Sequence, residues 1–331
     1  MPLLQIRNLT IDFRTLEGTL RAVYGVDLTV NEGEVVGLVG ESGCGKSQTC
    51  LSIPRLIHPS GIISADEIAF EGRELTKLGE RAMRSLRGNK ITMIFQEPMT
   101  SLNPCLTVGE QLAEPLVLHR GMDWHAAEDR VVETLSRVGI SDARQRYREY
   151  PHQLSGGMRQ RAMIAMALVC EPRLLLADEP TTALDVTVQA QILRLMLRLR
   201  DETGTAIVLV THNLGVVAQS CDRVSVMYAG RIVESGTTAH VFGSPEHPYT
   251  RGLMRSVPRL KPPAGAPVRL ESIPGSVPSI AAMPGGCPFH PRCRYAQELC
   301  AQALPSPVEL EGGHSSLCHF AGKLDSLGVT A

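Results

Sequence analysis

The sequence predicts an α/β fold with a mixed sheet core, an antiparallel β part and a helical insert, and three observations lead to this prediction. Short apolar runs typical of buried strands alternate with segments of helical spacing. A glycine-rich loop separates one of these strands from a helix. A stretch of helical spacing at about residues 98–170 interrupts the alternation, which indicates an insert.

The strands and helices follow in order along the chain. Strand patterns are predicted for the apolar/polar alternation at 3–13 and 20–30, the apolar run 34–39, and a strand–turn–strand at 66–75 around Glu71–Gly72. A helix is predicted from Lys46. Further buried strands are expected at 91–95, 173–177 and 206–210, helices at 108–119, 125–138, 157–170 and 186–201, and a hairpin at 223–234 with Ala229–Gly230 as its turn.

Composition narrows the class of protein. A chain of 331 residues is long enough for about two domains, and 43% apolar residues allow a large core. The 33 Lys and Arg residues nearly balance the 34 Asp and Glu residues, which argues against a nucleic-acid partner held by bulk charge. There is no run of about 18 apolar residues and no secretory signal pattern, so we expect the chain to stay in the cytoplasm.

The last part of the chain has a different composition. Residues 258–291 contain nine prolines, which disfavours another layer of helices and strands. We therefore predict an α/β domain at 1–250 and a C-terminal extension at 251–331, and we expect the extension to be separate from the rest.

A phosphate-binding loop is predicted from a G-x-x-x-x-G-K-S match between a buried strand and a helix. Its glycines allow successive backbone N–H groups to face phosphate oxygens, the lysine adds a charge for the β- and γ-phosphates, and the serine hydroxyl is a Mg²⁺ ligand. A chance glycine-rich turn is the weaker alternative in this context. The residues are Gly40, Glu41, Ser42, Gly43, Cys44, Gly45, Lys46 and Ser47.

Two carboxylates end the buried run 173–177. Asp178, at the carboxyl end of the strand, is placed to reach a Mg²⁺ shell, and Glu179 is placed to polarise a water for attack on the γ-phosphate. Surface Asp–Glu pairs are common, but here an apolar strand carries both carboxylates to the edge of a sheet, where ligands bind.

The segment Leu154–Met158 lies between the predicted phosphate loop and the two carboxylates, and it resembles the signature motif of ABC transporter ATPases. The other family motifs follow in order over about residues 1–250. Gln96 matches the Q-loop glutamine and His212 the switch histidine. The resemblance implies that Glu179, Gln96 and His212 are catalytic and that Ser47, Gln96 and Asp178 hold Mg²⁺. The signature comprises Leu154, Ser155, Gly156, Gly157 and Met158, and the D-loop comprises Ala183, Leu184 and Asp185.

The family resemblance also implies an arrangement of two ATPase domains. Each ATP is expected between the phosphate loop of one chain and the signature loop of the other. An aromatic residue upstream is expected to stack on adenine, with Phe13 as the first choice and Tyr24 as the second.

The insert and the extension are similar to those of dipeptide/oligopeptide importer ATPases, at Phe95–Pro104, Glu246–Leu253 and Gly286–Cys293. This similarity implies an ATPase that drives peptide uptake from the cytoplasmic face of the cell membrane, where it would be peripheral. The implied partners are a second, often different, ATPase chain, two permeases and a separate peptide-binding protein. A nickel or other small-solute importer of the same family is the alternative. Two rivals are a soluble ABC ATPase of DNA repair or translation and a redox-sensing iron–sulfur protein.

Four of the nine cysteines lie in the last 45 residues, with the spacing C-x5-C-x6-C-x17-C. No C-x2-C pair is present, so the residues alone indicate only that four thiolates could close a metal site, with His290, His314 and His319 as substitutes, or that the thiols are unligated. The family resemblance implies a [4Fe-4S] cluster on Cys287, Cys293, Cys300 and Cys318.

Overall fold

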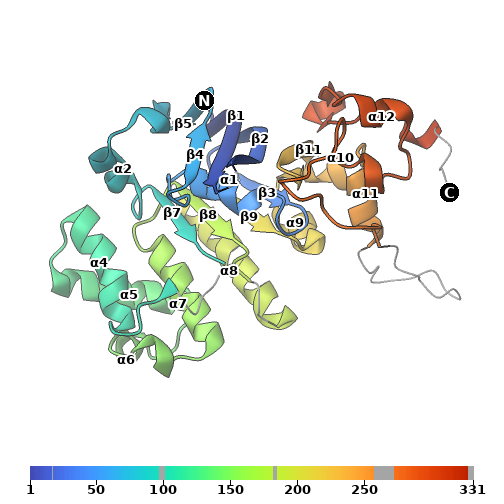
Figure 1. Cartoon of the computed structure of the whole chain (residues 1–331). Helices are drawn as coiled ribbons and strands as arrows, with labels where there is room; N and C mark the ends of the chain where they lie inside the picture. The colour runs from blue at the N-terminus through green and yellow to red at the C-terminus, as the bar shows by residue number, and fades with distance from the viewer. Residues whose placement is uncertain (17, 97–100, 182–184, 257–271, 327–331) are drawn as a thin grey trace, which may run out of the picture. The chain divides into compact units, whose positions relative to one another are not determined.

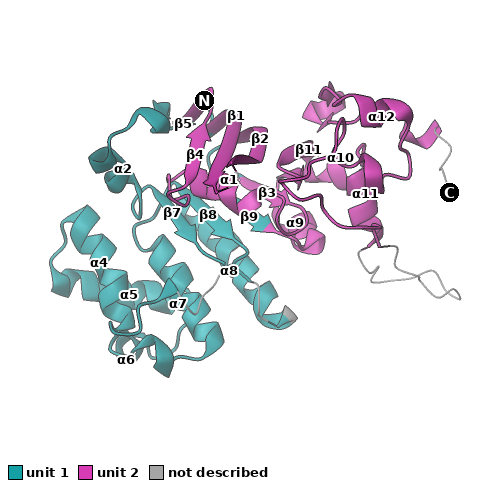
Figure 2. Ribbon diagram, in the orientation of Figure 1, with its two compact units in different colours: residues 1–4, 30–34, 69–210 teal, residues 5–29, 35–68, 211–331 magenta. Residues whose placement is uncertain are grey.

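The computed structural model describes residues 1–16, 18–96, 101–181, 185–256 and 272–326 (Figure 1). The chain divides into two compact units, coloured separately in Figure 2. Unit 1 comprises residues 1–4, 30–34 and 69–210, and unit 2 comprises residues 5–29, 35–68 and 211–331.

Three parallel strands form the sheet of unit 1. β7 (Ile91–Ile94) pairs with β8 (Leu174–Asp178), and β8 pairs with β9 (Ala206–Thr211). All five residues of β8 and all six of β9 are buried. Strands covered on both faces read as continuous apolar runs, which is why the sequence predicts them.

Helices make up most of the remainder of unit 1, and polar side chains fix their first turns. Thr107 forms a capping box with Glu110, while Asp123, Ser155 and Asp185 each accept a bond from a backbone N–H of the helix that they begin. The elements are β6 (Arg73–Glu74), η1 (Leu75–Lys77), α2 (Glu80–Leu86), α4 (Val108–Arg120), α5 (Trp124–Arg137), α6 (Ala143–Tyr147), η2 (Pro151–Gln153), α7 (Gly156–Leu168) and α8 (Val186–Thr203).

Unit 2 contains antiparallel pairing and the helix that follows the glycine-rich loop. β1 (Leu4–Thr15) pairs antiparallel with β4 (Gly61–Ser64). β3 (Val35–Val39) pairs parallel with β10 (Arg223–Tyr228), and β10 forms the predicted hairpin with β11 (Arg231–Thr237). The remaining elements before residue 211 are β2 (Gly18–Val30), α1 (Lys46–Ser52) and β5 (Glu67–Phe70), which runs on into unit 1.

The C-terminal part of unit 2 is more ordered than its proline content predicts. Two short strands extend the sheet, since β13 (Ser315–Ser316) pairs with β11 and β12 (Val308–Glu309) pairs with β13. The helices are α9 (Leu214–Ser220), α10 (Thr238–Gly243), α11 (Pro248–Arg255), η3 (His290–Arg292), α12 (Glu298–Gln302), η4 (Glu311–Gly313) and η5 (Leu324–Ser326). Among the described residues no helix is both long enough and apolar enough to span a bilayer.

A buried carboxylate fixes the start of the extension to this sheet. The side chain of Glu234 in β11 is fully buried and accepts bonds from the backbone N–H groups of Glu246 at 2.6 Å and His247 at 3.0 Å. His314 Nε2 lies 2.8 Å from the same carboxylate. One side chain therefore links the sheet, the entry to α11 and the residue before β13.

Candidate functional site

The predicted phosphate loop joins β3 to α1, and two of its glycines are sterically required. A Cβ at Gly40 would lie 2.1 Å from the carbonyl oxygen of Met227, and one at Gly45 would lie 2.8 Å from the Met227 side chain. Gly45 also has φ of 104°, a conformation that L-residues with a side chain rarely adopt. The loop therefore packs its backbone closely against the end of β10.

Lys46 lies inside this loop rather than on its surface. The side chain is buried, and Nζ donates to the carbonyl oxygens of Gly40 at 2.8 Å and Glu41 at 2.9 Å. Ser47, in the first turn of α1, is half-buried. Burial raises the pKa of the Cys44 thiol, which keeps that loop side chain neutral. The loop thus holds a buried ammonium group against its own backbone carbonyl oxygens.

The two carboxylates at the end of β8 have different surroundings. Asp178 is buried as the last residue of the strand. Glu179 has φ of 47°, and its backbone N–H donates to the carbonyl oxygen of Val210 at 2.9 Å. Gln96 Nε2 donates to Glu179 Oε2 at 3.3 Å, so the structure brings these two predicted residues together.

His212 follows β9 and is exposed. The next residue, Asn213, caps α9 by accepting bonds from the backbone N–H groups of Gly215 at 3.0 Å and Val216 at 3.3 Å. This cap fixes the backbone directly after the histidine.

The predicted signature opens α7 in unit 1. Ser155 Oγ accepts a bond from the backbone N–H of Met158 at 3.3 Å, and Leu154 is buried. A Cβ at Gly156 would meet no described atom within 4 Å, so packing within the described chain does not require a glycine there. The side chain of Gln160 donates to the carbonyl oxygen of Pro180, which ties α7 to the segment after Glu179.

The predicted residues are shared between the two units. Gln96, Asp178, Glu179 and the signature belong to unit 1, whereas the phosphate loop and His212 belong to unit 2. Asp185 caps α8 by accepting a bond from the backbone N–H of Val188 at 2.9 Å. Ala183 and Leu184 lie outside the described residues.

The two aromatic candidates for adenine stacking differ in their surroundings. Phe13 is half-buried in β1 and lies over Gly61 of β4, where a Cβ would approach the ring to 3.1 Å. The Arg231 guanidinium lies 4.7 Å from the centroid of the Tyr24 ring. One side of Tyr24 is therefore already covered, and Phe13 stays the predicted choice.

The four cysteines of the extension line one small cavity. Cys287, Cys293, Cys300 and Cys318 surround it together with aromatic and histidine side chains, and its volume is about 10 Å³. No three His, Cys, Asp or Glu side chains within the described ranges are close enough to hold a single metal ion. A cubane cluster distributes its four thiolates over four iron atoms, so it needs ligands around a shared space rather than around one point.

Two of these sulfurs already accept hydrogen bonds. The backbone N–H of Tyr295 donates to Cys293 Sγ and that of Phe320 donates to Cys318 Sγ, both at 3.4 Å. Such bonds are typical of thiolate ligands to metal clusters. Burial raises the pKa of Cys293 to about 12 and that of Cys318 to about 11, so both are neutral thiols near pH 7 unless a metal displaces the proton. The four thiols thus share one small cavity, and the described residues form no site for a single metal ion.

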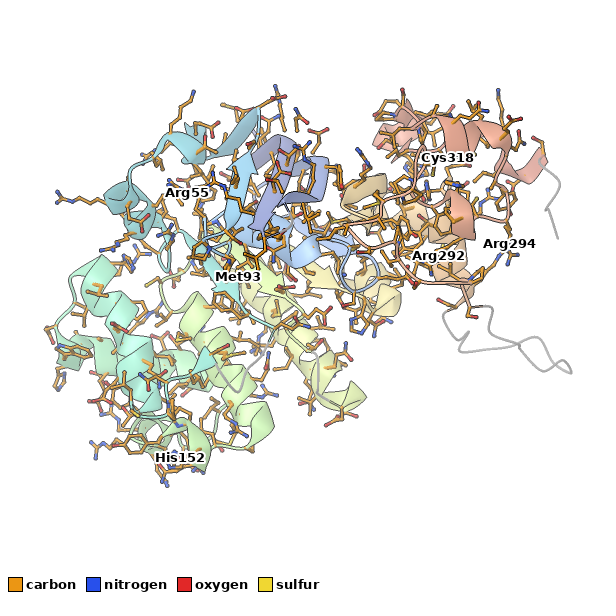
Figure 3. The ribbon with its side chains drawn as sticks, in the orientation of Figure 1. Arg55, Met93, His152, Arg292, Arg294 and Cys318 are labelled. Carbon is orange, nitrogen blue, oxygen red and sulfur yellow. The ribbon has the colours of Figure 1, made fainter. Side chains whose placement is uncertain are left out.

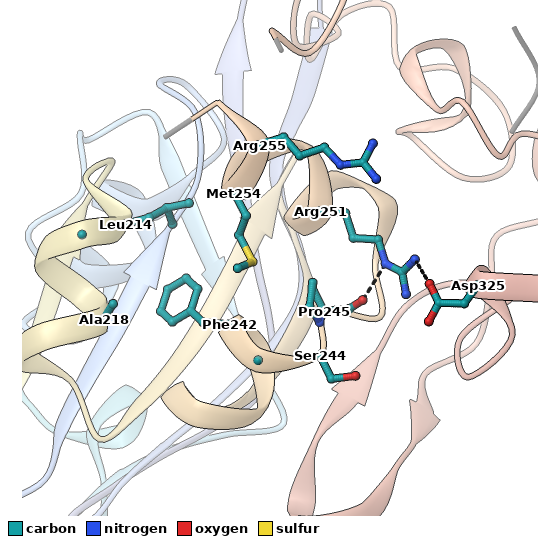
Figure 4. A pocket seen from close by; sticks show the side chains of 11 residues that line it. Leu214, Ala218, Phe242, Ser244, Pro245, Arg251, Met254, Arg255 and Asp325 are labelled. Atoms are coloured by element: carbon teal, nitrogen blue, oxygen red, sulfur yellow. Dashed lines mark hydrogen bonds and ion pairs between the residues drawn. The ribbon is translucent and has the colours of Figure 1, made fainter. Parts of the chain in front are cut away.

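A larger cavity lies elsewhere in unit 2. It has a volume of about 580 Å³ and is lined by α9, α10, α11 and Asp325 (Figure 4). Arg251 crosses its wall, donating to the carbonyl oxygen of Pro245 at 2.8 Å and pairing with Asp325 at 2.6 Å. None of the residues predicted for nucleotide or metal binding is among the described residues that line it.

Two residues that contact the predicted phosphate loop have no signal in the sequence. Tyr249 and Arg292, both in or near the predicted extension, contact Glu41. The contact between Arg292 and Glu41 joins residues 251 positions apart, and no local pattern indicates it. The expected separation of the extension from the rest of the chain therefore does not hold at this point.

Comparisons with known proteins agree along almost the whole chain. Residues 23–182 match the family model described as ABC transporter, and residues 233–300 match that of the oligopeptide/dipeptide transporter, C-terminal region. A putative peptide import ATP-binding protein of Brucella ovis is 55% identical over 96% of each chain. The oligopeptide transport ATP-binding protein OppD of Haemophilus influenzae is 49% identical, covering 97% of this chain and 98% of that protein.

A solved structure gives the same result for the fold. The bacterial ABC transporter cassette MJ0796, solved as a dimer, is 30% identical with a TM-score of 0.64, covering 71% of this chain and 98% of the cassette.

Proposed function

The chain belongs to the ABC transporter ATP-binding proteins, in the branch with the oligopeptide/dipeptide transporter C-terminal region, and from this premise we propose how its residues couple ATP hydrolysis to peptide import. It is the ATPase subunit of a peptide importer. The observation that carries this conclusion is the identity of 49–55% with peptide import ATP-binding proteins over almost the whole chain, extension included. These matches favour peptides over the nickel alternative.

In the proposed ATP site the phosphate loop, Gly40–Ser47, holds the triphosphate. The buried Lys46 ammonium turns from the carbonyl oxygens of Gly40 and Glu41 to the β- and γ-phosphates, which are stronger acceptors. Ser47, Gln96 and Asp178 are the proposed ligands of Mg²⁺, which when bound neutralises charge on the phosphates. Phe13 is the proposed stacking partner for adenine.

Hydrolysis is proposed to depend on Glu179. Its carboxylate accepts a proton from the attacking water while the water oxygen bonds to the γ-phosphorus and the bond to the β–γ bridging oxygen breaks. The hydrogen bond from Gln96 at 3.3 Å and the backbone bond to Val210 hold the carboxylate in place. His212, at the end of β9, is the proposed contact to the γ-phosphate.

A second ATPase subunit completes the proposed site. Ser155, Gly156 and Gly157 are exposed or half-exposed at the start of α7. The backbone N–H groups of this first helical turn are the proposed donors to a partner's ATP. Asp185 and the D-loop residues Ala183 and Leu184 are proposed to line the same interface. We expect the second subunit to be a different chain.

The remaining proposed partners are two permeases and a separate peptide-binding protein, with the chain peripheral on the cytoplasmic face of the membrane. The segment after Gln96 is the proposed permease contact, because it links the carboxylate of Glu179 to the helical insert. Residues 97–100 of this segment lie outside the described residues.

The substrate class is tested by uptake into proteoliposomes. The full chain is assembled with its permeases, its partner ATPase and the binding protein, and ATP is supplied at the ATPase face. We expect ATP-dependent accumulation of labelled di- or oligopeptide and none of Ni²⁺. Accumulation of Ni²⁺ without peptide would establish the nickel alternative instead.

The extension is proposed to hold one [4Fe-4S] cluster on Cys287, Cys293, Cys300 and Cys318. The support is the shared cavity, its aromatic lining and the N–H groups directed at two of the sulfurs. The cluster would supply a covalent cross-link between four segments of the chain, which have little regular structure to hold them. Because the cavity is small, binding requires the lining side chains to move outward.

The cluster proposal predicts the iron content of the protein. Anaerobically purified chain is expected to be brown with about four iron atoms, and Cys293→Ser is expected to remove the colour and to expose the extension to proteases. Cys105→Ser is the matched control, because Cys105 is an exposed cysteine of the insert. Zinc instead of iron, or full iron content in Cys293→Ser, would contradict the proposed ligands.

A further inference from the structure

The phosphate loop contains an acidic side chain, Glu41, whose negative charge opposes ATP binding. Glu41 directly follows Gly40, and a carboxylate within a few ångströms of a triphosphate repels it. A loop that binds ATP therefore needs this charge to be neutralised or directed elsewhere.

Arg292 of the extension forms an ion pair with this carboxylate. Its Nη1 and Nη2 atoms donate to the two Glu41 oxygens at 2.7 and 3.0 Å, a bidentate geometry. The Arg292 side chain is 5% exposed and that of Glu41 is 32% exposed. A pair shielded from water to this extent is screened little by salt.

Tyr249 of α11 holds the backbone of the same residue. The N–H of Glu41 donates to Tyr249 Oη at 2.9 Å, while the carbonyl oxygen of Glu41 accepts from Lys46 Nζ at 2.9 Å. Three polar groups of Glu41 are thus engaged, two of them by residues after position 248. The extension determines where this part of the loop lies.

Both residues are themselves rigidly placed. The rings of Tyr228, Tyr249 and Phe289 pack together with centroids 4.6–5.4 Å apart. The Arg292 guanidinium lies 5.7 Å from the Tyr228 centroid, and its Nε donates to the carbonyl oxygen of Pro274 at 2.8 Å. Arg292, which is labelled in Figure 3, ends η3 one residue before Cys293.

We propose that Arg292 and Tyr249 are positioning residues for ATP binding: Arg292 neutralises Glu41 and draws it out of the phosphate path, and Tyr249 fixes the loop backbone. The C-terminal extension then contributes residues that position the nucleotide site. This inference rests on the proposed role of residues 40–47 in binding the phosphates.

The test measures the Kd for ATP by titration of the purified full chain, with kcat at saturating ATP in the assembled transporter. Arg292→Met is expected to raise the Kd about five- to tenfold with kcat almost unchanged, because the loss is in ATP binding. Adding Glu41→Gln to Arg292→Met is expected to recover most of the affinity, since the repelling charge is then absent. Damage by loss of packing alone would not be rescued in this way.

Arg251→Met is the matched control, because it breaks a second arginine–carboxylate pair of the extension, Arg251–Asp325. Its Kd for ATP is expected to equal that of the wild type. If Arg292→Met does not fold, Tyr249→Phe keeps the ring packing, removes only the hydroxyl and is expected to raise the Kd several-fold.

Three results would overturn the proposal: an unchanged Kd in both Arg292→Met and Tyr249→Phe, an equal loss in Arg251→Met, or no rescue by Glu41→Gln. A wild-type chain that binds no ATP would refute the proposed function itself. ATP binding by the wild-type chain, together with an unchanged Kd in Arg292→Met and Tyr249→Phe, would refute only the positioning role.

Discussion

Glu179→Gln is expected to lower the rate of ATP hydrolysis at least about a hundredfold while leaving the Kd for ATP unchanged. Glutamine keeps the size of the side chain and an oxygen that can accept the bond from Gln96, but it cannot take a proton from water. The buried strand β8 and the backbone bond to Val210 should keep the residue in place. Phosphate release by the assembled transporter and ATP binding by the purified chain measure the two quantities.

The control for this substitution is Glu171→Gln. Glu171 precedes β8 and, like Glu179, has a positive φ, of 48° against 47°. Its side chain is half-exposed and pairs with Arg130, so its loss should cost little stability. Turnover close to the wild-type rate in Glu179→Gln would show that another group receives the proton.

Lys46→Ala is expected to raise the Kd for ATP and not only to slow hydrolysis. The change removes a buried ammonium that makes charge-assisted bonds, and such bonds to phosphate are worth a tenfold to hundredfold change in affinity, or about 1.5–3 kcal/mol. The Kd for ATP, measured by titration with a thermal unfolding curve alongside, reports the effect.

Lys77→Ala, which removes an exposed lysine of η1, is the control for this substitution and should bind ATP as the wild type does. An unchanged Kd in Lys46→Ala would remove the lysine from the proposed phosphate site.

The central strands were predictable because burial on both faces leaves a continuous apolar run. β3, β7, β8 and β9 all follow such runs, and the Ala229–Gly230 turn is a two-residue hairpin connection whose residues both have positive φ. The amphipathic spacing of α5 likewise predicted a helix with one buried face. These signals are local, so a single sequence contains them.

Other elements lacked a local signal. β4 has four residues between turns and β12 and β13 have two each, and so short a strand forms only because a neighbouring strand is already in place. α2 contains three charged residues among seven, which leaves little periodic pattern to detect. Tertiary contacts, rather than the local sequence, determine the structure of such segments.

The residues of the candidate site also differ in whether a local sequence pattern predicts them. Glycine spacing and strand position predict a phosphate loop, and the order of motifs predicts roles for Gln96 and the signature. The partners of Glu41 were invisible, because Tyr249 and Arg292 reach it only after β10, β11 and the extension fold beside the loop. The link from Gln160 to Pro180 is a further contact of this kind.

Peptide uptake by the reconstituted transporter tests whether ATP hydrolysis by this chain drives peptide import. Proteoliposomes that differ only in this chain are compared with ATP at the ATPase face, using the wild-type chain and Glu179→Gln. We expect ATP-dependent accumulation of labelled peptide with the wild-type chain and a large loss of uptake with Glu179→Gln, although both chains assemble and bind ATP. Equal uptake with the two chains, or wild-type ATP hydrolysis that moves no peptide, would contradict it.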